Sequence, residues 1–285
     1  MCRVLEVSRS GYYNWLAQKR KEVTERQKRR EEVQRKIYKF YHESFGTYGA
    51  TRIHKDLLAD GYKVSERTVG RYMQEMGLRA IPLNPYTITT DSNHEEPIFD
   101  DLVQQDFEVS EPNQVWVSDI TYIWTAEGWL YLAIILDLYS RKIIGWYAAD
   151  HMRKEIVLNA LRMAIDSRQP GEGLIVHSDR GSQYASLDYR EELTTIKALG
   201  SMSRKGNPFD NACAETFFAT IKKELIYRRS FMKRTETISL INWYISSFYN
   251  ERRRHSTNGY LSPNQYERGH FELDTIHMES YLLSA

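Results

Sequence analysis

The chain has 285 residues, of which 41% are hydrophobic and 27% are charged, a composition typical of a soluble globular protein with two or three modules. No stretch approaches the roughly 18 apolar residues of a membrane span, and no apolar run follows the charged N-terminus, so neither a membrane protein nor a signal peptide is predicted. Two cysteines exclude a disulfide framework and a zinc finger built from cysteine pairs, which favours a reducing, cytoplasmic setting.

The net charge of +1 hides an uneven distribution along the chain. Residues 1–80 hold 18 basic and 10 acidic side chains, residues 81–180 hold 7 and 16, and residues 181–285 hold 14 and 12. A basic segment suits a polyanion such as DNA, although solvated helix faces are the plain alternative. An acidic middle segment is unusual for simple DNA binding and indicates a site that collects cations.

The N-terminal part is predicted to be helical. Residues 1–16 indicate a short helix. Residues 19–41 are rich in Lys, Arg, Glu and Gln and have few apolar positions, which is typical of a solvent-facing helix. We therefore assign residues 1–41 to a helical segment and linker helix that serves first as a connector.

Residues 42–81 are predicted to form a small DNA-binding unit. Residues 51–59 carry apolar side chains at helical spacing, and a second helix begins with Ser65 as its N-cap. Two short helices joined by a glycine-containing turn describe a helix-turn-helix, with a generic helical hairpin as the alternative. Arg67 and Arg71 on the second helix are the candidate DNA contacts.

Residues 82–111 are predicted to be a linker. The stretch that begins here holds four of the seven prolines, together with Asn and Asp and few apolar positions. We expect a domain boundary in this segment.

The chain changes at Gln114 to a pattern of strands and helices. Runs of β-branched and aromatic residues with short turns between them predict an antiparallel meander of three strands, at 115–123, 129–136 and 142–148. A helical period then precedes a short buried strand at 174–177, which adds a parallel crossover. The predicted fold class is therefore α/β, a mixed sheet with helices on its faces.

Two more helices are expected towards the C-terminus. The first begins at Asp210 or Asn211 and runs to about residue 226, and the second covers about 235–250. We assign residues 112–270 to one core with its C-terminal helices, and residues 271–285 to a tail.

Three acidic residues stand where a structural protein does not need them. Asp119 interrupts a strand that otherwise reads as buried, where a lone carboxylate is costly unless it is paired or binds a metal. Asp179 follows the short buried strand, and strand ends of an α/β sheet are where sites are assembled. Glu215 lies in the first turns of a helix. Singly, each acid has an ordinary explanation as a cap or an ion-pair partner, but together they offer the oxygen ligands that hard divalent ions need.

Short motifs are spread over nearly the whole chain. They are, in chain order, Val7–Tyr13, Trp116–Tyr122, Asp137–Arg141, His177–Tyr184, Ser201–Asn207, Asp210–Ala212 leading to Glu215, Phe217–Glu224, Tyr249–Asn250, Arg254–His255 and Ser262–Pro263. Together they resemble the DDE transposases of the IS-three insertion-sequence group, specifically the larger subunit that carries the integrase core. The resemblance implies a ribonuclease-H-like mixed sheet of five strands flanked by helices, preceded by an all-α helix-turn-helix region.

The resemblance also implies roles for individual residues. Asp119, Asp179 and Glu215 match the catalytic and metal-binding triad for Mg²⁺ or Mn²⁺, with two ions expected, and 35 residues separate the second and third acids as in the family. Lys222 matches a basic residue that lies near DNA, although a solvated surface lysine is its plain alternative. The remaining candidate DNA contacts are Asn211, Arg204 and Lys205. Asp137 matches no ligand of the family and is expected to be structural.

The activity implied is metal-dependent DNA strand cleavage, followed by attack of the 3′-hydroxyl on another phosphodiester. The alternatives are a ribonuclease-H-like nuclease without strand transfer and a domesticated DNA-binding protein. The expected partners are the terminal inverted repeats, the target DNA and further copies of the chain. The sequence-reading module of this group is usually encoded in an upstream frame and joined by frameshifting, so that helix-turn-helix subunit is a further expected partner. The expected location is the bacterial cytoplasm, at the nucleoid.

Overall fold

The computed structural model describes residues 8–20, 24–81, 98–105, 107–204, 211–229 and 233–272. The chain divides into two compact units, residues 1–82 and 83–285, each with a hydrophobic core of its own. In the described ranges, no helix is long and apolar enough to cross a membrane. Most of the expected linker and nearly all of the expected tail lie outside the described residues.

The first unit is helical, and α2 is part of its core. Its helices are α1 (Arg9–Arg20), α2 (Glu25–Glu43), α3 (Ala50–Ala59) and α4 (Glu66–Glu75). Val33 and Ile37 of α2 are four residues apart, so they share one helix face, and they are buried together with Ile53, Leu57 and Val69. Most side chains of α2 are exposed, as expected for residues 19–41, but Val33 and Ile37 on one face pack the helix against α3 and α4.

Helices α3 and α4 form the expected pair of short helices. Ser65 caps α4, and its Oγ accepts a hydrogen bond from the backbone N–H of Thr68 over 3.3 Å. In the turn between the helices Gly61 has a φ of 84°, a conformation that glycine adopts without strain. Arg67 and Arg71 are exposed, so both basic side chains are open to solvent.

The second unit is built on one mixed sheet of five strands in the order β3-β2-β1-β4-β5. The strands are β1 (Val115–Thr125), β2 (Gly128–Asp137), β3 (Lys142–Ala149), β4 (Ile175–Ser178) and β5 (Leu199–Met202). The first three form an antiparallel meander, whereas β4 runs parallel to β1 and β5 runs parallel to β4. The expected α/β class, with a ribonuclease-H-like mixed sheet and flanking helices, is confirmed.

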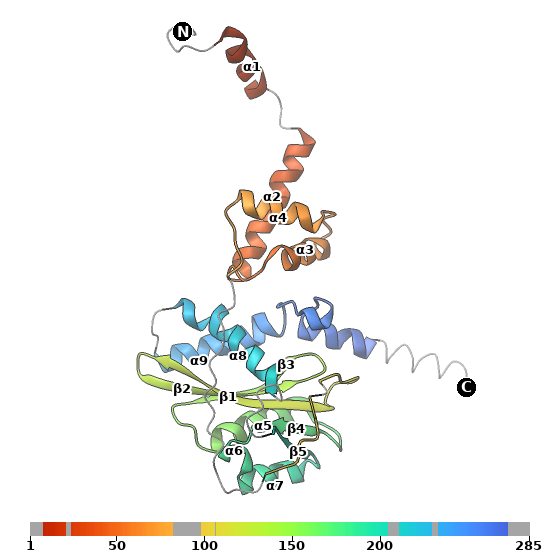
Figure 1. Cartoon of the computed structure of the whole chain (residues 1–285), viewed down its shortest axis with the longest axis vertical. Coiled ribbons are helices and arrows are strands. Elements are labelled where there is room, and N and C mark those ends of the chain that lie inside the picture. Colours follow the sequence, from red (N-terminus) through yellow and green to blue (C-terminus); the bar gives the residue numbers. More distant parts are fainter. Residues whose placement is uncertain are drawn as a thin grey trace, which may run out of the picture. The chain divides into compact units, whose positions relative to one another are not determined.

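Helices cover both faces of this sheet (Figure 1). One side carries α5 (Glu155–Arg168), α6 (Ser182–Ala185) and α7 (Leu187–Thr195), and the other carries α8 (Ala212–Glu224) and α9 (Arg234–Trp243). The helix α5 lies very close to β3 at Gly145, where a Cβ atom would stand 2.2 Å from the carbonyl oxygen of Ala160. Only glycine permits that contact. A π-helical turn, Tyr244–Tyr249, follows α9.

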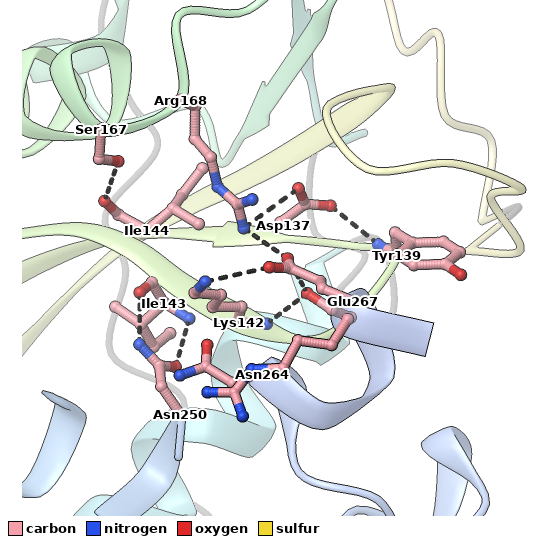
Figure 2. A network of polar contacts seen from close by, with 12 residues as sticks. Asp137, Tyr139, Lys142, Ile143, Ile144, Ser167, Arg168, Asn250, Asn264 and Glu267 are labelled. Atoms are coloured by element: carbon pink, nitrogen blue, oxygen red, sulfur yellow. Dashed lines mark hydrogen bonds and ion pairs between the residues drawn. The ribbon is translucent and has the colours of Figure 1, made fainter. Parts of the chain in front are cut away.

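A buried polar network pins the C-terminal residues to the sheet (Figure 2). Glu267 accepts hydrogen bonds from Lys142 over 3.0 Å and from Arg168. The Arg168 guanidinium also lies 3.8 Å from Asp137, which accepts a hydrogen bond from the backbone N–H of Tyr139 over 3.0 Å. These contacts hold Asp137 in a structural network at the end of β2, and they occupy the carboxylate that a metal ion would otherwise need.

Residues 98–105 lie within the expected linker but pack against the sheet edge. The Phe99 ring packs against the core beside Gly200, whose added Cβ would stand 2.6 Å from it. The backbone N–H of Leu102 donates to Ser201 Oγ over 2.9 Å, and the N–H of Met202 donates to the Asp100 carbonyl over 3.3 Å. This part of residues 82–111 therefore belongs to the second unit. Its few apolar residues follow neither a helical nor a strand periodicity, so the sequence does not indicate that this segment packs against the sheet.

Candidate active site

Asp119 and Asp179 are brought together by the register of two parallel strands. Val117 of β1 pairs with His177 of β4, so two further steps along each strand lead to Asp119 and Asp179. Beyond that pair β4 ends, and β1 continues with β2 alone at its side. The two aspartates therefore stand where the sheet opens between β1 and β4, Asp179 just after the carboxyl end of β4 and Asp119 in the middle of β1.

The ionised form of Asp119 is disfavoured by burial and by the negative charges of its neighbours. Its side chain is buried, and Oδ1 accepts a hydrogen bond from the backbone N–H of Ile120 over 2.8 Å. Burial raises the pKa of Asp119 well above its usual value, and the charges of Asp179 and, less strongly, Glu215 raise it further. Asp179 and Glu215 are thus each close enough to repel the charge of Asp119, and a bound cation would relieve that repulsion.

The turn that carries Asp179 is held by its neighbours. Asp179 Oδ1 accepts a hydrogen bond from the backbone N–H of Gly181 over 2.9 Å. His177 is fully buried, and its ring nitrogens lie 2.8 Å from Ser201 Oγ and 3.2 Å from Ser203 Oγ. These contacts of His177 connect the end of β4 to the end of β5. The backbone at Asp179 therefore takes its direction from the sheet.

Glu215 comes to the site from the opposite layer, in the first turn of α8. Its side chain is half-buried, and burial raises its pKa. Among the residues that the structure describes, no three His, Cys, Asp or Glu side chains converge closely enough to enclose a metal ion. Glu215 therefore stands near the two aspartates without closing a complete ligand cage around one ion.

Lys222 adds a cation beside the acids. It follows Glu215 by seven residues, nearly two helical turns, and so lies on the same face of α8. Burial lowers the pKa of Lys222, while the charge of Asp119 raises it. Its Nζ lies 4.9 Å from the centre of the Tyr122 ring on β1. Lys222 is thus partly buried and interacts with the charge of Asp119, which a solvated surface lysine would not do.

The other expected DNA contacts differ in position. Asn211 is buried, and its Nδ2 donates to the carbonyl oxygen of Ser118 over 3.4 Å, a contact that joins α8 to β1. Arg204 is exposed and lies 3.5 Å from Asp101. Lys205 lies outside the described residues.

Two buried hydroxyl groups beside the acids belong to no expected role. Ser118 directly precedes Asp119, and Tyr184 lies on α6, just after Asp179. Both residues fall within the motifs that carry the family resemblance, which is the only signal in the sequence that points to them. Their partners are visible in the tertiary structure alone.

Family models match both units of the chain. Residues 109–208 and 199–263 match models described as integrase core domain, and residues 28–86 match one described as HTH-like domain. The catalytic core domain of the HTLV-2 integrase, solved in complex with magnesium, is 16% identical and covers 55% of this chain and 97% of its own, with a TM-score of 0.44. Because the two family models of the second unit both describe an integrase core domain, this unit is the integrase core of a DDE-type polynucleotidyl transferase.

Curated relatives define the family more closely. The transposase InsF for insertion sequence IS3A of Escherichia coli (strain K12) is 42% identical over 267 residues, which are 94% of this chain and 92% of that protein. An uncharacterized 31 kDa protein of the insertion element IS600 from Shigella sonnei is 43% identical over 92% of this chain and 96% of its own. The chain belongs to the IS3 family of insertion-sequence transposases, enzymes that cleave and join DNA strands. The resemblance seen in the motifs is confirmed.

Proposed function

We propose that Asp119, Asp179 and Glu215 are the ligands of divalent cations, two Mg²⁺ or Mn²⁺ ions, in a transposase that acts on the terminal repeats of its own element. The observation that carries this proposal is the pair of aspartates at the opening between β1 and β4, where Asp179 and Glu215 raise the pKa of Asp119. Carboxylate oxygens are the ligands that such hard ions prefer, so the donor set fits. Glu215 would complete it from α8.

The proposed reaction has two stages. Water first cleaves the DNA strand at the end of the element, and the freed 3′-hydroxyl then attacks a phosphodiester of the target DNA. Divalent ions at such a site activate the attacking oxygen and stabilise the leaving one. The protein orients the carboxylates through the backbone of β1 and the end of β4, and Lys222 holds a DNA phosphate beside them. No covalent bond between protein and DNA is required.

The test of this proposal uses labelled DNA that carries the element's own ends. In Mg²⁺ the full chain should nick the ends and then join them to target DNA, and EDTA should abolish both steps while end binding persists in a gel-shift assay. Nicking without any joined product would instead identify a plain nuclease of the same fold. Binding that is unaffected by EDTA and by changes to all three acids, with no cleavage, would identify a DNA-binding protein with an inactive core.

Lys222→Ala should lower the rate of strand transfer by about tenfold, the equivalent of about 1.4 kcal/mol for one charged hydrogen bond to a phosphate. The slope of log binding constant against log salt concentration, measured for binding to the element ends, should decrease in magnitude by about one. Lys223→Ala is the matched control, because the neighbouring lysine on α8 points about 100° away around the helix. Equal losses in the two variants would contradict a specific role for Lys222. The measurement is single-turnover strand transfer at several salt concentrations.

We also propose that α4 contacts DNA through Arg67 and Arg71. Both side chains are exposed in a unit where residues 1–80 carry an excess of basic groups. The double variant Arg67→Ala/Arg71→Ala should weaken binding to the terminal repeats and reduce the salt slope by about two, one for each lost phosphate contact. Activity on short pre-cleaved ends at high enzyme concentration should survive. An unchanged salt slope would remove α4 from the DNA interface.

The wider assembly follows from the same chemistry. Arg204, at the end of β5, and Lys205 after it are proposed to contact the phosphate chain beside the acids. Paired ends and target DNA call for several copies of the chain on one DNA complex, and the helix-turn-helix subunit of the upstream frame is the proposed partner in end recognition. Such a complex would work in the bacterial cytoplasm, at the nucleoid.

A further inference from the structure

A pair of buried hydroxyl groups lies directly behind the two aspartates. Ser118 is fully buried on β1, and Tyr184 is buried on α6. A hydrogen bond joins Ser118 Oγ and Tyr184 Oη over 3.0 Å, and the Ser118 hydroxyl also lies 2.9 Å from the carbonyl oxygen of Ile134 on β2. The phenol is therefore attached to the strand that carries Asp119.

The same pair also reaches the segment that carries Asp179. Tyr184 follows Asp179 by five residues, across a turn in which Gly181 N–H donates to Asp179 Oδ1. Burial raises the pKa of Tyr184 well above its usual value, and the charges of Asp179 and Asp119 raise it further. The phenol thus lies within the field of both carboxylates, and one hydrogen bond links β1, which carries Asp119, to α6, which follows the turn of Asp179.

A third link runs from Ser118 to the helix of Glu215. The carbonyl oxygen of Ser118 accepts a hydrogen bond from Asn211 Nδ2 over 3.4 Å, and Asn211 precedes Glu215 by about one helical turn. The side chain of Ser118 is therefore tied to the Asp179 segment, and its backbone to the Glu215 helix. Asp119 is the next residue in the chain.

We propose that Ser118 and Tyr184 are positioning residues that set the spacing of the Asp119 and Asp179 carboxylates for divalent cations, with Asn211 extending the restraint to Glu215. The inference rests on the proposed function of the three acids. Groups behind the ligands orient them, and losing such a group typically lowers metal affinity by about ten- to hundredfold. The opposing view is that the hydroxyl pair only fastens α6 to the sheet, in which case its loss lowers stability and nothing else.

The test removes single oxygen atoms from the full-length chain. Tyr184→Phe keeps the buried ring and deletes the hydroxyl, and Tyr244→Phe is the matched control. Tyr244 is equally buried and donates a hydrogen bond over 2.7 Å to Glu224, the last residue of α8, so its hydroxyl also has a buried partner, here a carboxylate. The readout is Mn²⁺ binding without DNA, followed by the electron paramagnetic resonance of free Mn²⁺, with thermal unfolding recorded for each variant.

Tyr184→Phe should bind Mn²⁺ at least about tenfold more weakly than the wild-type chain does, whereas Tyr244→Phe should bind it with wild-type affinity. High Mn²⁺ should restore strand transfer to Tyr184→Phe. Ser118→Ala should show the same weakening, and the double variant should lose no more than either single one, because both act through one hydrogen bond. Wild-type Mn²⁺ affinity in Tyr184→Phe would overturn the inference, whatever the change in its melting temperature. A wild-type chain that binds no Mn²⁺ would overturn the proposed metal site itself.

Discussion

Replacing Asp179 by asparagine is expected to abolish strand transfer while leaving DNA binding nearly intact. The change keeps the size of the side chain and its contact with the Gly181 N–H, but removes one of two charges that stand together at the end of β4. Loss of about 4 kcal/mol of transition-state stabilisation corresponds to about a thousandfold in rate. Single-turnover assays on pre-cleaved ends measure this directly.

The matched control for this change is Asp188→Asn. Asp188 is an exposed aspartate on α7 that pairs with Lys154 over 2.7 Å, and such surface pairs contribute less than about 1 kcal/mol. This variant should keep full activity. Gel-shift titration of both variants on the terminal repeats separates catalysis from binding. Strand transfer at the wild-type rate in Asp179→Asn would refute the assignment of the acids.

Arg168→Met is expected to destabilise the integrase core by about 3–5 kcal/mol, the usual cost of leaving buried charges without their partner. Arg168 is the cation between Asp137 and Glu267, and both carboxylates are almost fully buried (Figure 2). Arg162→Met on the same helix is the control. Arg162 pairs with Glu192 in solvent and should cost less than about 1 kcal/mol. Urea unfolding of both variants provides the comparison.

The destabilisation should depend on pH in a defined direction. Burial opposes the ionised form of Glu267, but Arg168 and Lys142 bring its pKa below the ordinary value of 4.5, so this contribution is present above that value and is lost as the pH falls through the folded pKa. Burial raises the pKa of Asp137 to about 6, so Asp137 is protonated first. The gap between Arg168→Met and wild type should therefore narrow as the pH is lowered from 7 to 4. A gap that is constant over this range would mean that lost packing, not charge, is responsible.

Local patterns in the sequence were sufficient for most elements of the fold. The runs of β-branched residues predicted β1, β2 and β3 to within two residues at each end, and Ser65 marked the start of α4. The local pattern did not reveal that α2 packs into a core, because the burial of Val33 and Ile37 depends on residues of other elements, among them Ile53 and Val69. It failed again for residues 98–105, where single contacts of Phe99 and Leu102 with β5 replace any period.

By itself, the sequence determined which residue types were available and where the strands would end, because turn chemistry and hydrophobic period act over a few residues. It therefore identified Asp119, Asp179 and Glu215 as candidates and, through the motifs, the family. Only the tertiary structure decided that Val117 pairs with His177, which places two aspartates 60 positions apart side by side. It likewise decided that Asn211 is buried and that Ser118 meets Tyr184. Such contacts depend on the register of strands joined through a crossover, and no local pattern encodes that register.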